Sequence, residues 1–190
     1  MKTMNTILAA SLTLALAACA NNETKTSNQA TQQETMVKNL NNDDLYEVHA
    51  EGRLYVFDDK ATYQEFLTVG ETSYRQTFIG TGPHGQTVVF GMTSKDKKKH
   101  YSKIAGYNLY HGALAAAEVF YGEARLDGRI YVFDRLEDMK AVREIGEASL
   151  RYTDIGSGPK GETVVYVLRG DNKKVKPVAL IEQFKLRNNI

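Results

Sequence analysis

The sequence predicts an α+β fold: an internally duplicated ββαββ(β) unit, with two antiparallel sheets packed with pseudo-two-fold symmetry and one helix per repeat. The first observation is that residues 52–89 align with residues 128–165 after a shift of 76 residues, without a gap and with 19 of 38 positions identical. The second is that short strand-like segments and glycine turns surround one helical stripe in each copy. Because one helix cannot cover several strands, we expect the copies to bury their open faces against each other.

Each repeat is expected to begin with a β-hairpin. In the second copy the segments YGEARL and RIYVF flank Asp127 and Gly128, the dipeptide most typical of a type I′ turn. The first copy has Glu51 and Gly52 at the same place. The same turn is therefore predicted in both copies.

A helix is expected after each hairpin. Asp58 and Asp134 are predicted to be the helix caps, and Glu137 completes the spacing of a capping box in the second copy. Gly70 and Gly146 follow the helical segments and are expected to end them. The two copies share apolar positions at helical spacing, namely Tyr63/Met139, Phe66/Val142 and Val69/Ile145.

A second hairpin is expected at residues 74–79 and 87–92, with its equivalent in the second copy. A fifth strand is predicted at residues 102–110 and again at 178–184. The alanine-rich segment 113–119 joins the copies and is compatible with a short helix.

The loops of the second hairpins carry a G-x-G-x-x-G pattern. A dinucleotide site needs a helix directly after this pattern, whereas Thr-Val-Val, a strand-forming segment, follows it here. We interpret both loops as turns whose glycines supply positive φ. The glycines are Gly80, Gly82 and Gly85, and Gly156, Gly158 and Gly161.

The histidines do not recur between the copies. A lysine or arginine cannot bind a metal ion at neutral pH as imidazole does, so the repeated frame is predicted to hold no metal and no cofactor. A metal site private to the first copy stays open. After the shift each histidine aligns with a cation, as His49/Arg125, His84/Lys160, His100/Lys176 and His111/Arg187.

Charged residues that recur are candidate site residues. One hypothesis makes them structural ion pairs, with Glu71 as the partner of Arg75. The other places the four arginines around a cleft between the copies, where they bind a carboxylate or phosphate. The face of residues 74–79 that both copies share is expected to point inward. The recurring residues are Arg53/Arg129, Glu71/Glu147 and Arg75/Arg151.

The charge balance and the lysines give weaker indications. Lys and Arg number 24 against 23 Asp and Glu, a balance that argues against a nucleic-acid partner. The lysines of residues 95–99 and 173–176 occupy equivalent turns. Such lysines either blunt a sheet edge or contact anionic headgroups.

The amino terminus has the layout of an export signal, with Lys2 before an apolar run at residues 7–18. The run ends in Leu-Ala-Ala-Cys, where Cys19 is the only cysteine, and resembles the lipobox of bacterial lipoproteins. The resemblance implies a diacylglyceryl thioether on Cys19, cleavage after Ala18, and acylation of the new amino terminus, typically with palmitate. Ala20 in place of Asp implies the outer membrane.

The expected layout follows from these segments: a signal peptide at 1–18, the lipidated cysteine and a disordered tether at 19–43, repeat 1 at 44–112, a connector at 113–120 and repeat 2 at 121–190. Residues 51–74 are similar to a YHS-type module, through Phe57 and a second Phe nine residues on. Metal-binding members place cysteines where this chain has Asp58, Lys60 and Thr62. The resemblance therefore implies only the ββα start of each repeat.

These observations indicate a lipoprotein whose folded part faces the periplasm, binds an envelope protein or supports an envelope assembly, and catalyses no reaction. The alternative is a sensor or carrier of a small anionic ligand held between the repeats. A hydrolase comes third, because the shared Ser73 and Ser149 have no shared histidine to activate them.

Overall fold

The computed structural model describes residues 40–190. The predicted signal peptide, Cys19 and the tether up to residue 39 lie outside these residues. The described chain is mixed α+β, with eight strands, four α-helices and one 3-10 turn. Their order is β1 (Asp44–Ala50), β2 (Arg53–Phe57), α2 (Lys60–Val69), β3 (Tyr74–Phe78), β4 (Thr87–Met92), η1 (Tyr101–Lys103), α3 (Ala105–His111), β5 (Tyr121–Leu126), β6 (Arg129–Phe133), α4 (Leu136–Ile145), β7 (Arg151–Asp154), β8 (Thr163–Val167) and α5 (Val178–Asn188).

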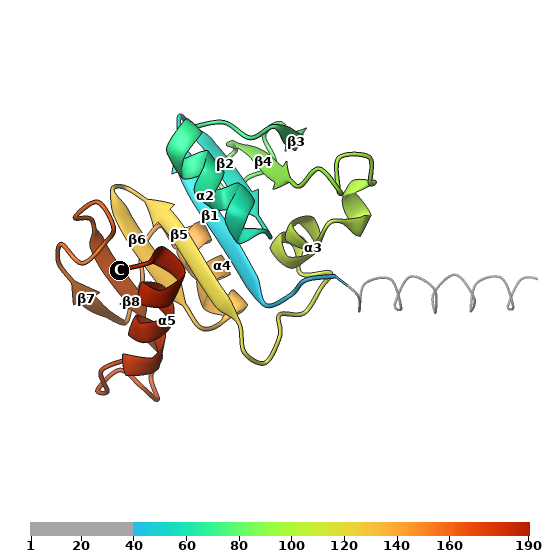
Figure 1. Cartoon of the computed structure of the whole chain (residues 1–190). Helices are drawn as coiled ribbons and strands as arrows, with labels where there is room; N and C mark the ends of the chain where they lie inside the picture. The colour runs from blue at the N-terminus through green and yellow to red at the C-terminus, as the bar shows by residue number, and fades with distance from the viewer. Residues whose placement is uncertain (1–39) are drawn as a thin grey trace, which may run out of the picture. The chain divides into compact units, whose positions relative to one another are not determined.

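All strands belong to one eight-stranded sheet, in the order β3-β4-β2-β1-β5-β6-β8-β7 (Figure 1). The prediction of two packed sheets was therefore wrong. The reason lies at the centre of the sheet, where β1 and β5 pair in parallel from Asp44↔Tyr121 to Val48↔Arg125. Backbone hydrogen bonds thus join the repeats edge to edge, and their faces do not stack on each other.

The two halves of the sheet have the same internal arrangement. Read outward from the centre, each half presents its first, second, fourth and third strand. The register is also the same, since Arg53 pairs with Thr87 and Arg129 pairs with Thr163. The duplication in the sequence therefore reappears as equal strand order and equal pairing.

Two hydrophobic clusters lie on the two faces of the sheet. Neighbouring strand residues alternate between them, as Leu54 and Tyr55 do on β2. One cluster includes Phe66 of α2 and Phe184 of α5, and the other includes Leu109 of α3 and Met139 of α4. Each face is therefore covered by one helix from each repeat.

The predicted count of one helix per repeat was wrong, and so were the fifth strands at 102–110 and 178–184. These segments form α3 and α5. In α5 the buried residues are Leu180, Ile181 and Phe184, which lie at helical spacing and not at the alternating spacing of a strand. Without these helices a large part of each sheet face would contact water.

The hairpin prediction is confirmed at both turns. Glu51 and Gly52 have φ of 53° and 71°, and Asp127 and Gly128 have φ of 51° and 73°, as a type I′ turn requires. The second hairpins are also confirmed, as β3–β4 and β7–β8. Their glycine loops are turns between strands and not the start of a helix.

For α2 and α4, the predicted carboxyl-terminal ends are confirmed, but the predicted amino-terminal caps are not. Gly70 and Gly146 end α2 and α4 with φ of 82° and 88°. The predicted caps Asp58 and Asp134 are wrong, because each helix begins one residue later. Asp59 caps α2 through Thr62 N–H, whereas the N-cap position of α4 is Arg135, whose side chain makes no capping hydrogen bond.

The segment between the repeats is irregular and forms no helix. Leu114 and Phe120 are buried in the cluster beneath α3 and α4. The connector therefore contributes to the core although it has no regular structure.

Candidate functional site

The shared face of β3 and β7 points toward solvent, so the prediction that it points inward was wrong. Arg75 and Thr77 are exposed, and Ile79 directly after β3 is 86 % exposed. Its equivalent, Ile155, is 84 % exposed. The opposite side of β3 is the packed one, because the Phe78 ring lies 5.4 Å from the Tyr107 ring of α3.

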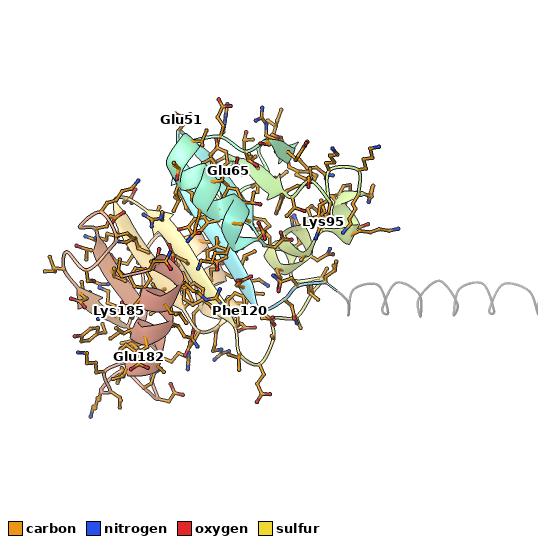
Figure 2. The ribbon with its side chains drawn as sticks, in the orientation of Figure 1. Glu51, Glu65, Lys95, Phe120, Glu182 and Lys185 are labelled. Carbon is orange, nitrogen blue, oxygen red and sulfur yellow. The ribbon has the colours of Figure 1, made fainter. Side chains whose placement is uncertain are left out.

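The exposed face of repeat 1 forms an open depression of about 600 Å³, which we call the repeat-1 site. Its floor is the outer sheet face of β2, β4 and β3, and one wall is the carboxyl end of α2. Figure 2 shows Glu51, one of its lining residues, at the tip of the β1–β2 hairpin. The lining is Glu51, Arg53, Tyr55, Val69, Gly70, Glu71, Thr72, Arg75, Thr77, Ile79, Thr87 and Val89.

A smaller depression of about 260 Å³, the repeat-2 site, lies on the outer strands of the other half. Every residue that lines it is identical to the residue 76 positions earlier, and every one of those lines the repeat-1 site. The lining is Arg129, Arg151, Thr153, Ile155, Thr163 and Val165.

Packing does not account for these identities at the exposed positions. A fold retains Val89 and Val165 because they are buried, but a solvent-facing strand position accepts many side chains. An apolar side chain as exposed as Ile79, retained beside an exposed arginine, is typical of a surface that binds something. The two sites are therefore our candidate functional sites.

The sites lie on opposite faces of the sheet. Val89 belongs to the cluster covered by α2 and α5, and Val165 belongs to the cluster covered by α3 and α4. The hypothesis of one cleft between the copies with all four arginines around it was therefore wrong. Each depression has two arginines of its own repeat.

Within residues 40–190 the guanidinium groups of the two arginines in the repeat-1 site make few polar contacts. Arg53 donates to the Tyr55 hydroxyl at 3.4 Å. Within residues 40–190 neither Arg53 nor Arg75 has a carboxylate within 4 Å, so the expected Glu71–Arg75 pair does not form there. In the repeat-2 site Arg151 lies 3.5 Å from Glu147 and donates to Ala148 O at 2.6 Å.

Guanidinium groups and threonine hydroxyls on an open surface are suited to bind carboxylates or phosphates. In the described part of the chain neither Ser73 nor Ser149 has a hydrogen bond to a histidine or carboxylate, and the serine that bonds to a histidine is Ser102. Among those same residues no group of three His, Asp or Glu side chains is placed to hold a metal ion. None of the helices within residues 40–190 has both the length and the hydrophobicity of a membrane span.

Another depression, of about 390 Å³, lies between α3 of repeat 1 and α4 of repeat 2. Its lining includes His111, Lys140 and Arg143. Burial and the nearby Arg143 lower the pKa of His111, so its imidazole is neutral at pH 7. This depression contains none of the arginines that recur between the copies.

Buried polar residues at the centre of the sheet were missed by the sequence interpretation. Glu47 on β1 and Glu123 on β5 are both fully buried and lie 76 positions apart, just outside the aligned segment. Glu123 accepts hydrogen bonds from Tyr63 of α2, from Tyr121 at 2.9 Å and from Asn188 at 3.0 Å. Extending the alignment of the two copies toward the amino terminus would have revealed this pair of glutamates.

The two aspartates predicted as caps stabilise other elements. Asp58 accepts the backbone N–H of Gly106 in α3 at 2.6 Å. Asp134 accepts from Arg169 at 2.5 Å. Burial, together with the nearby carboxylates of Asp96 and Asp59, raises the pKa of Asp58 to about 6, although the Gly106 N–H opposes that shift.

We expect Asp58 to make stability depend on pH. Because its pKa is higher in the folded chain than the unfolded value of 3.8, its contribution is fully present below pH 3.8 and is lost as the pH rises through about 6. Asp58→Asn keeps an acceptor for Gly106 and removes this titration. The difference in unfolding free energy between variant and wild type should therefore shift by up to about 3 kcal/mol in favour of the variant from pH 4 to pH 7.

The measurement is urea unfolding of both proteins across that pH range. Comparing the two proteins cancels the titration of all other groups. A difference that stays constant from pH 4 to pH 7 would contradict the prediction.

Comparison of the chain with known family models, with curated protein sequences and with solved structures found no match.

Proposed function

We propose that this chain is a lipid-anchored, non-catalytic binding protein of the bacterial envelope. Cys19 anchors it in the outer membrane, and the folded domain faces the periplasm. Its two equivalent sites bind anionic groups of an envelope protein. The observation that carries the proposal is that all six lining residues of the repeat-2 site recur at the repeat-1 site, exposed ones included.

The form of the sites favours a macromolecular partner over a small ligand. Small-ligand sites are enclosed and mostly apolar, whereas both depressions are open sheet surfaces with arginines at their borders. The exposed Ile79 and Ile155 add apolar contact area, as anchors at the centre of a protein interface do.

We also infer that the two repeats are related by a pseudo-two-fold axis along the central strands. A rotation about such an axis keeps β1 and β5 parallel and exchanges the two faces of the sheet. The equal outward strand order and the position of the two sites on opposite faces support this relation.

The test is the double variant Arg75→Ala/Arg151→Ala in the full chain. Partner proteins crosslinked to the chain in intact envelopes should fall to less than about a tenth of the wild-type amount, because both anion contacts are lost. Both arginines are exposed, so the melting temperature should stay within about 2 °C of the wild-type value.

The matched control is Arg135→Ala/Lys185→Ala, which removes the same charge away from both sites. Lys185 lies on α5 (Figure 2), and Arg135 contacts only Glu137 among the described carboxylates. The control should crosslink like the wild type. Equal losses in both double variants, or unchanged crosslinking in the first, would reject the two sites as the binding surface.

A second candidate function is binding of a small anion in the depression between α3 and α4. Its lining residue Lys140 has no carboxylate partner within residues 40–190 and supports this candidate. Arg143 supports it less, because Arg143 already binds Glu47.

A further inference from the structure

The sheet ends in two free edges, and each edge borders one of the two sites. Within residues 40–190, β3 pairs only with β4, and β7 pairs only with β8 (Figure 1). Leu168 N–H donates to Leu150 O at 2.9 Å, just before β7 begins. Because an antiparallel ladder alternates, the backbone groups of Arg151 and Thr153 then point away from β8.

The same alternation applies to β3, whose register with β4 equals that of β7 with β8. Arg75 and Thr77 therefore present both their side chains to the repeat-1 site and their backbone N–H and C=O groups to the free edge. Backbone groups of this kind are a template for an added strand.

Cations border both faces of each edge strand. On β3, Arg75 lies on the site face, and Lys97 Nζ lies 4.9 Å from the centre of the Tyr74 ring on the other. On β7, Arg151 lies on the site face, and Lys176 Nζ lies 5.7 Å from the Tyr152 ring centre. Figure 2 shows Lys95 in the loop that follows β4, and the same loop contains Lys97.

These cations indicate which kind of strand can be added to the edge. If an edge of one copy of this chain paired with an edge of a second copy, like charges would come together, so a second copy is disfavoured as the added strand. An acidic segment would instead meet a cation on each face. The charge therefore favours a strand with carboxylate side chains.

We infer that the partner contributes an extended acidic segment that pairs with the free edge of β3 or β7 as an added strand. This inference rests on the proposed function and names the chemistry of its partner. The side chains that the segment must match are Arg75, Thr77 and Ile79, two residues apart on one face. The segment therefore has a carboxylate and an apolar residue four positions apart, separated by about 13 Å.

The position of the sites on opposite faces sets the number of partners. One flat surface cannot contact both sites, and the two edges lie at opposite ends of the sheet. Each molecule therefore binds two segments, one at each edge, and can bridge two partner chains.

The probes for the test are two capped peptides that contain Glu-Thr-Thr-Val-Ile or the reverse order, since strand direction is not fixed by the side-chain pattern. They are titrated calorimetrically into the full chain in detergent micelles. At least one order should bind with a stoichiometry of two. Arg75→Glu should reduce this number to one, and Arg75→Glu/Arg151→Glu should weaken binding at least tenfold.

Two control peptides separate strand addition from simple charge attraction. A peptide with proline at the central position keeps the charge but lacks the N–H of a strand and should not bind. A peptide with lysine for glutamate should not bind either. Hydrogen exchange of the Arg75 and Thr77 amides should slow at least tenfold with the acidic peptide.

Equal binding of the proline peptide, or unchanged exchange at Arg75 and Thr77, would overturn strand addition. Failure of both acidic peptides would overturn it as well. The proposed function fails separately, when envelope crosslinking does not depend on Arg75 and Arg151.

Discussion

Arg143→Ala is expected to lower the free energy of unfolding by about 3 to 5 kcal/mol, because it leaves the Glu47 carboxylate buried without its cation. Glu47 is fully buried, and Arg143 is 6 % exposed. Arg143 Nε donates to Glu47 Oε1 at 2.7 Å, and a second bond comes from its terminal nitrogen. The guanidinium also lies 4.1 Å from the centre of the Tyr110 ring.

This ion pair joins the two repeats, so its loss is expected to destabilise both of them. Glu47 lies on β1 of repeat 1 and Arg143 on α4 of repeat 2. Because the pair joins the repeats, we expect the variant to unfold as one unit at a lower urea concentration, without a separate transition for either repeat. Urea unfolding of the full chain measures the loss of unfolding free energy.

Two variants test the physical reason. Arg135→Ala removes an exposed arginine from the N-cap position of the same helix and should change the free energy by less than about 0.5 kcal/mol. Glu47→Leu/Arg143→Leu removes both buried charges and should recover most of the loss. If Arg143→Ala lowers the free energy of unfolding by less than about 1 kcal/mol, the carboxylate of Glu47 is not left buried without a partner, and the prediction is contradicted.

Gly91→Ala is expected to lower the free energy of unfolding by about 1 to 3 kcal/mol, because the added methyl group overlaps a buried ring. A Cβ at Gly91 would collide with atoms Cδ1 and Cε1 of Phe57. Phe57 is fully buried, and its ring packs 5.2 Å from that of Phe66 and 6.0 Å from that of Tyr63. The ring therefore has little room to move.

The repeat offers a direct comparison, because Val167 occupies the position equivalent to Gly91 in the second copy. The control is Gly170→Ala, where a Cβ meets no atom within 4 Å and φ is not positive. Its stability should stay within about 0.5 kcal/mol of the wild-type value. Thermal unfolding measures both variants, and equal melting temperatures would contradict the proposed collision.

The residues that are identical in the two copies are of two kinds, buried and exposed. Val88 and Val164 recur because they are fully buried in equivalent strands. Arg75 and Arg151 recur although they are exposed, and the sequence alone could not separate these cases. A period of two shows that two faces differ, but it does not show which of them is packed.

The sequence by itself determined the features that depend on neighbouring residues. The turns at Gly52 and Gly128, the helix ends at Gly70 and Gly146, and the hairpins with glycine loops all follow from backbone conformations that few residues adopt. The helical stripes follow at Tyr63/Met139 and Phe66/Val142, which are buried, because their spacing is local. The third predicted pair, Val69 and Ile145, was wrong, since both side chains are exposed.

The tertiary structure alone decided how these elements assemble. Parallel pairing of β1 with β5 made one sheet where two were predicted, and it placed the equivalent sites on opposite faces. The same assembly buried Glu47 beneath α4 and left Arg75 at a free edge. Pairing between residues far apart in the chain is set by the total of buried surface and backbone hydrogen bonds, which no local pattern encodes.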